Sequence, residues 1–217
     1  MIEFDKIYLS WRRGQGIERH IVGFLEKHLD GTFKFQYDLT KVEQAKQEGF
    51  SPYTEFVDLT KTYNGNVLDI FAQRLTKAER TDVQGFYDFW EIEPKFIQDK
   101  FYLLGHTQGL LPTDNFEFLA DYKPVPTLHF LTDLAHVAEK KIPAGAFVVN
   151  DKLRYELDRE NSHYDFAVKV FKGDKKIGFI KKIHSKVFYS SKQELKLTVK
   201  AVDQNGYIKR LFVKVSY

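Results

Sequence analysis

The sequence predicts an α+β protein of two modules: a small sheet with helices in residues 1–120, and a small β-barrel in residues 121–217. Three observations lead to this fold class. Apolar runs give way to helical patterns in the first part, and closely spaced strand patterns with Gly or Asn turns fill the second. A polar segment with two prolines, residues 120–127, separates the two parts and favours extended backbone.

The first module begins with three expected strands. Residues 7–11 and 20–25 are short apolar runs around RRGQG (12–16), whose two glycines predict a hairpin turn. Phe33, Phe35 and Tyr37 alternate on one face and predict the third strand. The arginines of RRGQG could contact phosphate, but two glycines at a hairpin more often simply turn the chain.

Helical patterns follow these strands. Residues 40–49 read as a helix with Thr40 as its N-cap and Gly49 as its end. Residues 66–80 place apolar side chains on one helical face, and a further helix is expected over 81–94, with Thr81 as its cap. Residues 99–119 predict a helix, a glycine-rich turn and a short final element.

The second module has the spacing of a small, mostly β barrel. Helical patterns are confined to residues 133–141 and 182–192. The expected strands are 126–132, 146–158, 166–172, 176–180, 194–203 and 207–216.

Charge is distributed unevenly along the chain. Residues 1–120 carry 14 Lys and Arg against 19 Asp and Glu, whereas residues 121–217 carry 19 against 11. A basic second module favours contact with a polyanion, although a lysine-rich surface also serves solubility alone.

Composition narrows the chemistry. The absence of cysteine excludes disulfides, thiol catalysis and thiolate metal sites, and the seven histidines lack metal-ligand spacing, so we expect no metal and no cofactor. The N-terminus lacks a signal-peptide pattern, and no apolar run is long enough to span a bilayer. We therefore expect a cytoplasmic protein with no membrane partner.

A motif in the second module resembles the HIRAN domain family. The segment LDRENSHYDFAVKVFKGDKKIGFIKKIHSKVF (157–188) has the order and spacing of that family's core, and the resemblance extends over about residues 125–215. The matching positions are Leu157, Arg159, Glu160, Asn161, Tyr164, Asp165, Ala167, Val168, Val170, Ile177, Gly178, Phe179 and Ile180.

The resemblance implies a nucleic-acid-binding barrel of OB-like or SH3-like character with one or two short helices. In eukaryotic members of the family the domain captures the 3′ end of single-stranded DNA. Carried onto this chain, Asp165 would accept a hydrogen bond from the terminal hydroxyl. The implied nucleic-acid-binding residues are His129, Phe130, Arg159, Asn161, Tyr164, Asp165, Phe179, Lys181 and Lys182.

Their implied roles differ. Tyr164 and Phe130 would stack on bases, while Arg159, Lys181 and Lys182 would hold phosphates. The chain departs from the family by running directly from Asp165 through Phe166 to Ala167, one residue shorter than usual. An alternative interpretation is structural: Asn161 and Asp165 close a turn through side-chain-to-backbone bonds, and Tyr164 packs on the barrel.

The first module resembles the N-terminal subdomain of HipA-type toxin kinases. The resemblance lies in the order and residue pattern of the expected strands and helices in residues 7–38, 67–80 and 99–119. It implies regulation or partner docking. The chain has neither a Walker-type glycine-rich loop nor a His-Arg-Asp catalytic signature, so kinase activity is not expected.

We therefore expect a non-enzymatic protein that binds single-stranded DNA or DNA ends, with no catalytic residues. The alternative is a regulatory protein-interaction module of a toxin–antitoxin-like or phage-defence system, whose partner would be a co-encoded HipA-like kinase or another protein. Salt-dependent DNA binding would favour the first hypothesis.

Overall fold

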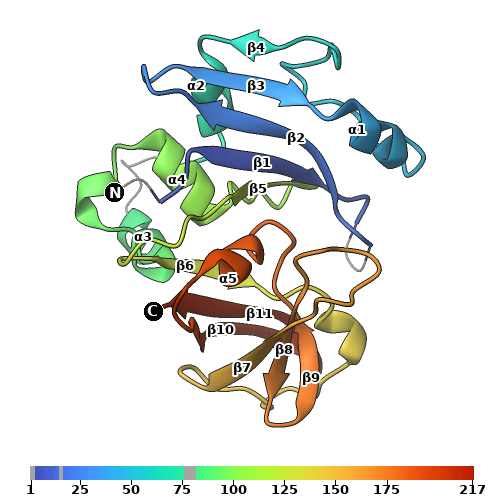
Figure 1. Cartoon of the computed structure of the whole chain (residues 1–217), viewed down its shortest axis with the longest axis vertical. Helices are drawn as coiled ribbons and strands as arrows, with labels where there is room; N and C mark the ends of the chain where they lie inside the picture. The colour runs from blue at the N-terminus through green and yellow to red at the C-terminus, as the bar shows by residue number, and fades with distance from the viewer. Residues whose placement is uncertain (1–2, 15–16, 76–81) are drawn as a thin grey trace. The chain divides into compact units, whose positions relative to one another are not determined.

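The computed structural model describes residues 3–14, 17–75 and 82–217 (Figure 1). The chain divides into a first unit, Phe4–Asp121, and a second unit, Tyr122–Tyr217 together with Glu3. Gln15 and Gly16 of the expected hairpin turn lie outside the described residues, as do residues 76–81, which include the expected cap Thr81. None of the helices in the described part has the length and apolarity needed to cross a bilayer.

The first unit is a five-stranded antiparallel sheet with helices. The strand order is β4-β3-β2-β1-β5, so the last strand in sequence pairs with the first. The strands are β1 (Lys6–Trp11), β2 (His20–Lys27), β3 (Phe33–Tyr37), β4 (Tyr63–Asn64) and β5 (Phe116–Ala120). The helices are α1 (Leu39–Lys46), α2 (Val67–Ala72), α3 (Val83–Trp90), the 3₁₀ helix η1 (Pro94–Phe96) and α4 (Lys100–Thr107).

Aromatic side chains form the core of this unit. Phe35 and Phe118 project from the sheet, and each has its ring centroid within 5.0 Å of that of Phe71 on α2. All three are fully buried. The predicted sheet with helices is therefore present, and the short final element is strand β5.

The expected N-cap of the first helix is wrong. Asp38 caps α1, because its backbone is extended and its side chain accepts a hydrogen bond from the backbone N–H of Lys41 at 3.1 Å. Thr40 lies one residue inside the helix. Asp and Thr are both good N-cap residues, and the sequence alone does not show at which of the two the helix begins.

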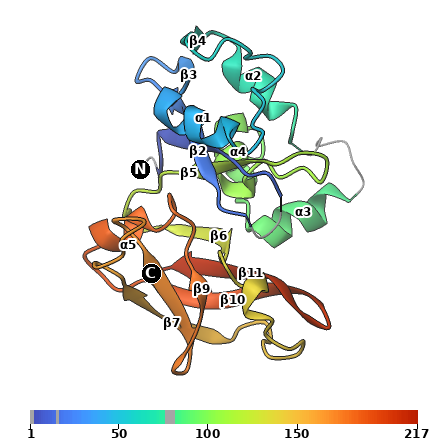
Figure 2. The same ribbon diagram turned by 90° about the vertical axis from the view of Figure 1, so that its right-hand side faces the viewer.

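The second unit is a six-stranded antiparallel sheet that curls into a half-barrel (Figures 1 and 2). Its strand order is β6-β11-β10-β7-β8-β9, with each strand inside or close to an expected range. The elements are β6 (His129–Asp133), the 3₁₀ helix η2 (Ala138–Lys140), β7 (Lys152–Leu157), β8 (Val168–Lys172), β9 (Lys175–Phe179), α5 (Lys186–Ser190), β10 (Lys196–Asn205) and β11 (Tyr207–Ser216).

Two backbone hydrogen bonds join the outer strands of this sheet. The N–H of Ala135, just after β6, donates to the carbonyl of Phe179 at 2.8 Å, and the N–H of Phe179 donates back at 3.0 Å. Gly178 permits this approach, because a Cβ atom there would lie 2.6 Å from the carbonyl oxygen of Ala135. A backbone atom cannot move aside as a flexible side chain does, so the closure needs a glycine at this position.

We expect Gly178→Ala to destabilise the protein, because the added methyl group forces the two edges apart. Overpacking of this kind costs about 1–3 kcal/mol. Denaturant unfolding followed by circular dichroism measures the effect. The control is Gly85→Ala in α3, where a Cβ meets no atom within 4 Å and the change is neutral or slightly stabilising. Equal stability of the two variants would contradict the role of the closure.

Candidate nucleic-acid interface

The loop between β7 and β8, residues 158–167, is fixed by its own hydrogen bonds. The N–H of Asp158 donates to the carbonyl of Ala167 at 2.8 Å and closes the base of the loop. The Oδ1 atom of Asn161 accepts from the backbone N–H groups of His163 and Tyr164, at 3.0 and 3.1 Å. Asn161 therefore shapes the turn, as the structural interpretation of the sequence predicted for this residue.

The same interpretation expected the side chain of Asp165 to help close the turn. In the structure the side chain of Asp158 does so instead. Its carboxylate accepts a hydrogen bond from Asn161 Nδ2 at 3.0 Å and pairs with Lys169 Nζ at 3.0 Å. The hydrogen bond from Asn161, followed by the interaction with Lys169, holds the pKa of Asp158 below its ordinary value. The loop is thus tied to β8 through an ionised carboxylate.

Three aromatic side chains meet beside this loop. The ring of Phe166 is 38% exposed, and its centroid lies 5.9 Å from that of Tyr164 and 5.4 Å from that of Tyr189. Both tyrosines are anchored by their hydroxyls: Tyr164 donates to the carbonyl of Lys182, and Tyr189 donates to that of Ala167 at 2.8 Å. Burial raises the pKa of Tyr189, although the nearby Arg159 acts in the opposite direction. The raised pKa keeps the phenol protonated, so that it can donate its hydrogen bond.

Two cations lie against these rings. The guanidinium of Arg159 is 5.3 Å from the ring centroid of Tyr189, and Lys182 Nζ is 5.9 Å from that of Tyr164. We call Arg159, Tyr164, Phe166, Lys182 and Tyr189 the loop platform. It offers an exposed aromatic surface with positive charge at its margin, which suits a planar ligand that carries negative charge.

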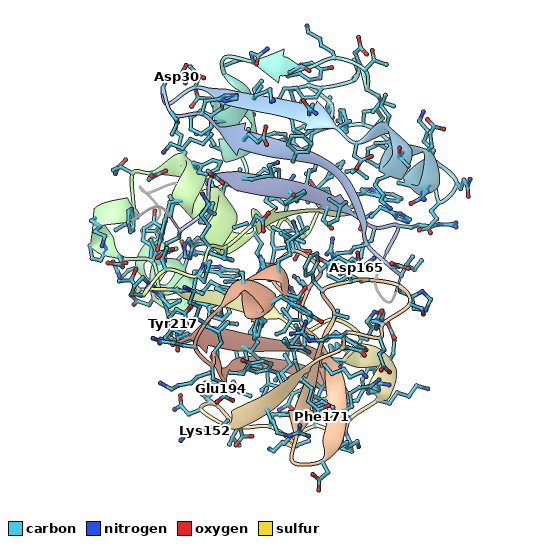
Figure 3. The ribbon with its side chains drawn as sticks, viewed as in Figure 1. Asp30, Lys152, Asp165, Phe171, Glu194 and Tyr217 are labelled. Carbon is cyan, nitrogen blue, oxygen red and sulfur yellow. The ribbon has the colours of Figure 1, made fainter. Side chains whose placement is uncertain are left out.

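Asp165 stands between two members of the platform in sequence, and Figure 3 labels it on the β7–β8 loop. Its side chain is exposed. Within residues 3–14, 17–75 and 82–217 its carboxylate takes part in no hydrogen bond or ion pair. It is therefore available as an acceptor next in sequence to the exposed ring of Phe166.

The structure brings together five of the nine residues expected from the resemblance. Arg159, Asn161, Tyr164 and Asp165 share the β7–β8 loop, and Lys182 contributes its carbonyl and side chain to Tyr164. His129 lies on β6 with its Nδ1 atom 3.2 Å from the carbonyl of Thr127. Phe179 lies at the end of β9, outside the platform.

Two of the expected residues are buried, which corrects their assignment. Phe130 is 1% exposed, and its ring stacks on that of Tyr122 at 4.0 Å between centroids, so it offers no face to a base. Lys181 is 7% exposed and forms an ion pair with Asp133, which also pairs with Arg210 at 3.3 Å. A lysine neutralised in the core cannot hold a phosphate.

Sequence reasoning missed Phe166 and Tyr189. Phe166 carries a usable signal in the sequence, because a large apolar ring directly follows the polar run from Asp158 to Asp165. Tyr189 lies on α5, in a segment expected to be helical. Its approach to Phe166 depends on where α5 packs, which no local pattern gives.

No family model matches the chain, and no curated protein matches it. Among solved structures, the crystal structure of the HIRAN domain of human HLTF matches at 14% identity and a TM-score of 0.32. The match covers 40% of this chain and 74% of that one, and the likeness is weak. None of these findings supports the resemblance to HipA-type kinases, which stays a prediction. Among the described residues, no cluster of three or more His, Asp and Glu side chains is arranged to hold a metal ion.

We expect Asn161→Ala to raise the pKa of Asp158, because it removes the largest favourable hydrogen bond to the carboxylate. In the native protein the stabilisation from this carboxylate is present above the unfolded pKa of about 3.9 and is lost as the pH falls through the lower native pKa. Carboxyl NMR titration measures both values. Ser162→Ala, in the same loop but outside the hydrogen-bond set, serves as the control, and an unchanged pKa in Asn161→Ala would contradict the assignment.

Proposed function

We propose that the second unit is a non-catalytic module that binds single-stranded DNA on the loop platform, with a preference for a 3′ end. The observation that supports this proposal is the exposed ring of Phe166, held between two anchored tyrosines and flanked by Arg159 and Lys182. Stacking of a base on an aromatic side chain contributes about 1–3 kcal/mol and tolerates any sequence. On this proposal the curled sheet is an OB-like or SH3-like barrel.

The charge of the second unit supports contact with phosphates. Residues 122–217 carry 19 Lys and Arg against 10 Asp and Glu. Binding that neutralises phosphates releases counterions, so affinity falls as salt rises. Arg159 and Lys182 lie beside the rings, where they would contact the backbone of a strand whose bases lie on Phe166.

Asp165 supports the preference for an end. A carboxylate beside an aromatic surface repels phosphates unless it meets a hydrogen-bond donor. Along a DNA strand the free 3′ hydroxyl is such a donor, whereas a 3′ phosphate is not. Because Asp165 has no partner within the described chain, it would not have to break an existing bond to accept from the hydroxyl.

We expect Phe166→Ala to weaken binding of a labelled oligothymidine by about 5- to 150-fold, the loss of one stacked base. Fluorescence anisotropy at low salt measures the affinity. The matched control is Tyr207→Ala at the β10–β11 turn, since Tyr207 is 42% exposed and Phe166 is 38% exposed. Equal affinities of the two variants would refute the platform, and no binding by the wild type would turn attention to protein partners.

We expect the wild type to bind a strand with a free 3′ hydroxyl about 10-fold or more tightly than the same strand with a 3′ phosphate, as a charge-assisted hydrogen bond predicts. Asp165→Ala should remove this discrimination. Asp174→Ala, which removes an exposed carboxylate from the β8–β9 turn, should retain it. If Asp165→Ala discriminates as well as the wild type, Asp165 does not read the end, although the stacking platform is unaffected.

A further inference from the structure

The outward face of three neighbouring strands interleaves aromatic rings with cations. The strand register aligns six residues in two rows: Arg154, Phe171 and Lys176 form one, and Glu156, Lys169 and Phe179 form the other. We call these six residues the β7–β9 outer face. The alternate residues on the same strands, among them Leu153, Val168 and Val170, are buried, which identifies the two rows as the solvent side of the sheet.

Both rings of the face have a cation within 5.0 Å of the ring centroid. The guanidinium of Arg154 lies 4.3 Å from the ring centroid of Phe171, which Figure 3 labels on β8. Lys176 Nζ lies 5.0 Å from that of Phe179. Both rings are half-buried, so each keeps an accessible part beside its cation. The face has three cations and one carboxylate, Glu156, which pairs with Arg154.

This arrangement suits a single strand rather than a duplex. Phe171 and Phe179 occupy diagonal positions on paired strands, which places their side chains about 7–8 Å apart. Stacked bases in a duplex are closer, at about 3.4 Å along each strand, and their faces are covered by one another. Unpaired bases are free to spread and to stack on aromatic rings or on guanidinium planes.

The outer face is continuous with the loop platform along the chain. Lys169 in its second row pairs with Asp158, which closes the base of the β7–β8 loop. Lys182 of the platform follows Phe179 by three residues. A strand whose 3′ end lies at Asp165 therefore has rings and cations on the adjoining strands along which to continue.

We propose that the β7–β9 outer face is a second contact site for single-stranded DNA, which runs from the loop platform onto Phe179 and Phe171. The inference rests on the proposed function and adds the path of the bound strand. It also gives Phe179 a role in binding on the surface of the sheet, whereas the resemblance implied a role for it together with the residues of the β7–β8 loop.

The length of the bound strand tests the inference. We would compare oligothymidines of about 5 and about 12 nucleotides, a range that brackets single-strand site sizes on small barrels. The variants are Phe171→Leu, which keeps an apolar side chain but removes the ring face, Lys176→Gln, which removes the charge of a half-buried side chain and keeps a polar one, and Phe166→Ala. Tyr207→Leu is the matched control. Fluorescence anisotropy measures affinity for each length.

We expect Phe171→Leu to weaken binding of the longer strand about fivefold or more and to leave the shorter strand unchanged, while Lys176→Gln reduces the salt dependence of the longer strand alone. Phe166→Ala should weaken both lengths. If Phe171→Leu and Lys176→Gln bind the longer strand like the wild type while Phe166→Ala weakens it, the inference is overturned and the proposed function stands. If Phe166→Ala also binds like the wild type, both are overturned.

Discussion

The second unit depends on the closure of its sheet between Ala135 and Phe179. Two backbone hydrogen bonds join the edges there, and Gly178 leaves room for them. The ladder continues past the closure, since the N–H of Ile180 donates to the carbonyl of Val168 at 3.0 Å. Val168 begins the strand that the β7–β8 loop enters, so the closure also fixes where that loop leaves the sheet. The closure thus sets where the loop leaves the sheet, and the side chains of Asn161, Tyr164 and Tyr189 hold the platform on it.

The same closure determines which of two consecutive lysines, Lys181 and Lys182, is buried. After Phe179 the chain places Ile180 and Lys181 inside, and the buried Lys181 pairs with Asp133. Lys182 is half-buried and reaches the ring of Tyr164. A buried ion pair contributes little net stability, but removing one partner costs about 3–5 kcal/mol because a charge is left uncompensated. Lys181 is therefore a structural residue beside a residue of the candidate site, and their sequence neighbours do not distinguish them.

Local patterns predicted much of the fold and part of the site. Alternation of apolar residues located the strands of both units, and the Asn161 turn was recognised from its residue type. The site residues that were wrongly assigned or missed depend on non-local packing. Phe130 is an aromatic residue on a strand, and only the position of Tyr122 and His184 shows that its ring faces the core. Tyr189 reaches Phe166 because α5 packs near the loop, a contact that joins residues far from the expected motif.

Because hydrogen bonds hold the β7–β8 loop in place, its structure limits the kind of ligand that the loop platform can bind. Each platform tyrosine is anchored by its hydroxyl, and the turn beneath them is closed by Asn161 and Asp158. A surface that is ordered before binding loses little conformational entropy when a ligand arrives, so a small number of contacts is enough. Rings and cations distinguish neither one base from another nor one phosphate from the next. On the proposed function, selectivity has to come from a group that occurs once in a strand. Asp165, an exposed carboxylate on this loop with no partner within the described residues, would accept from a terminal hydroxyl.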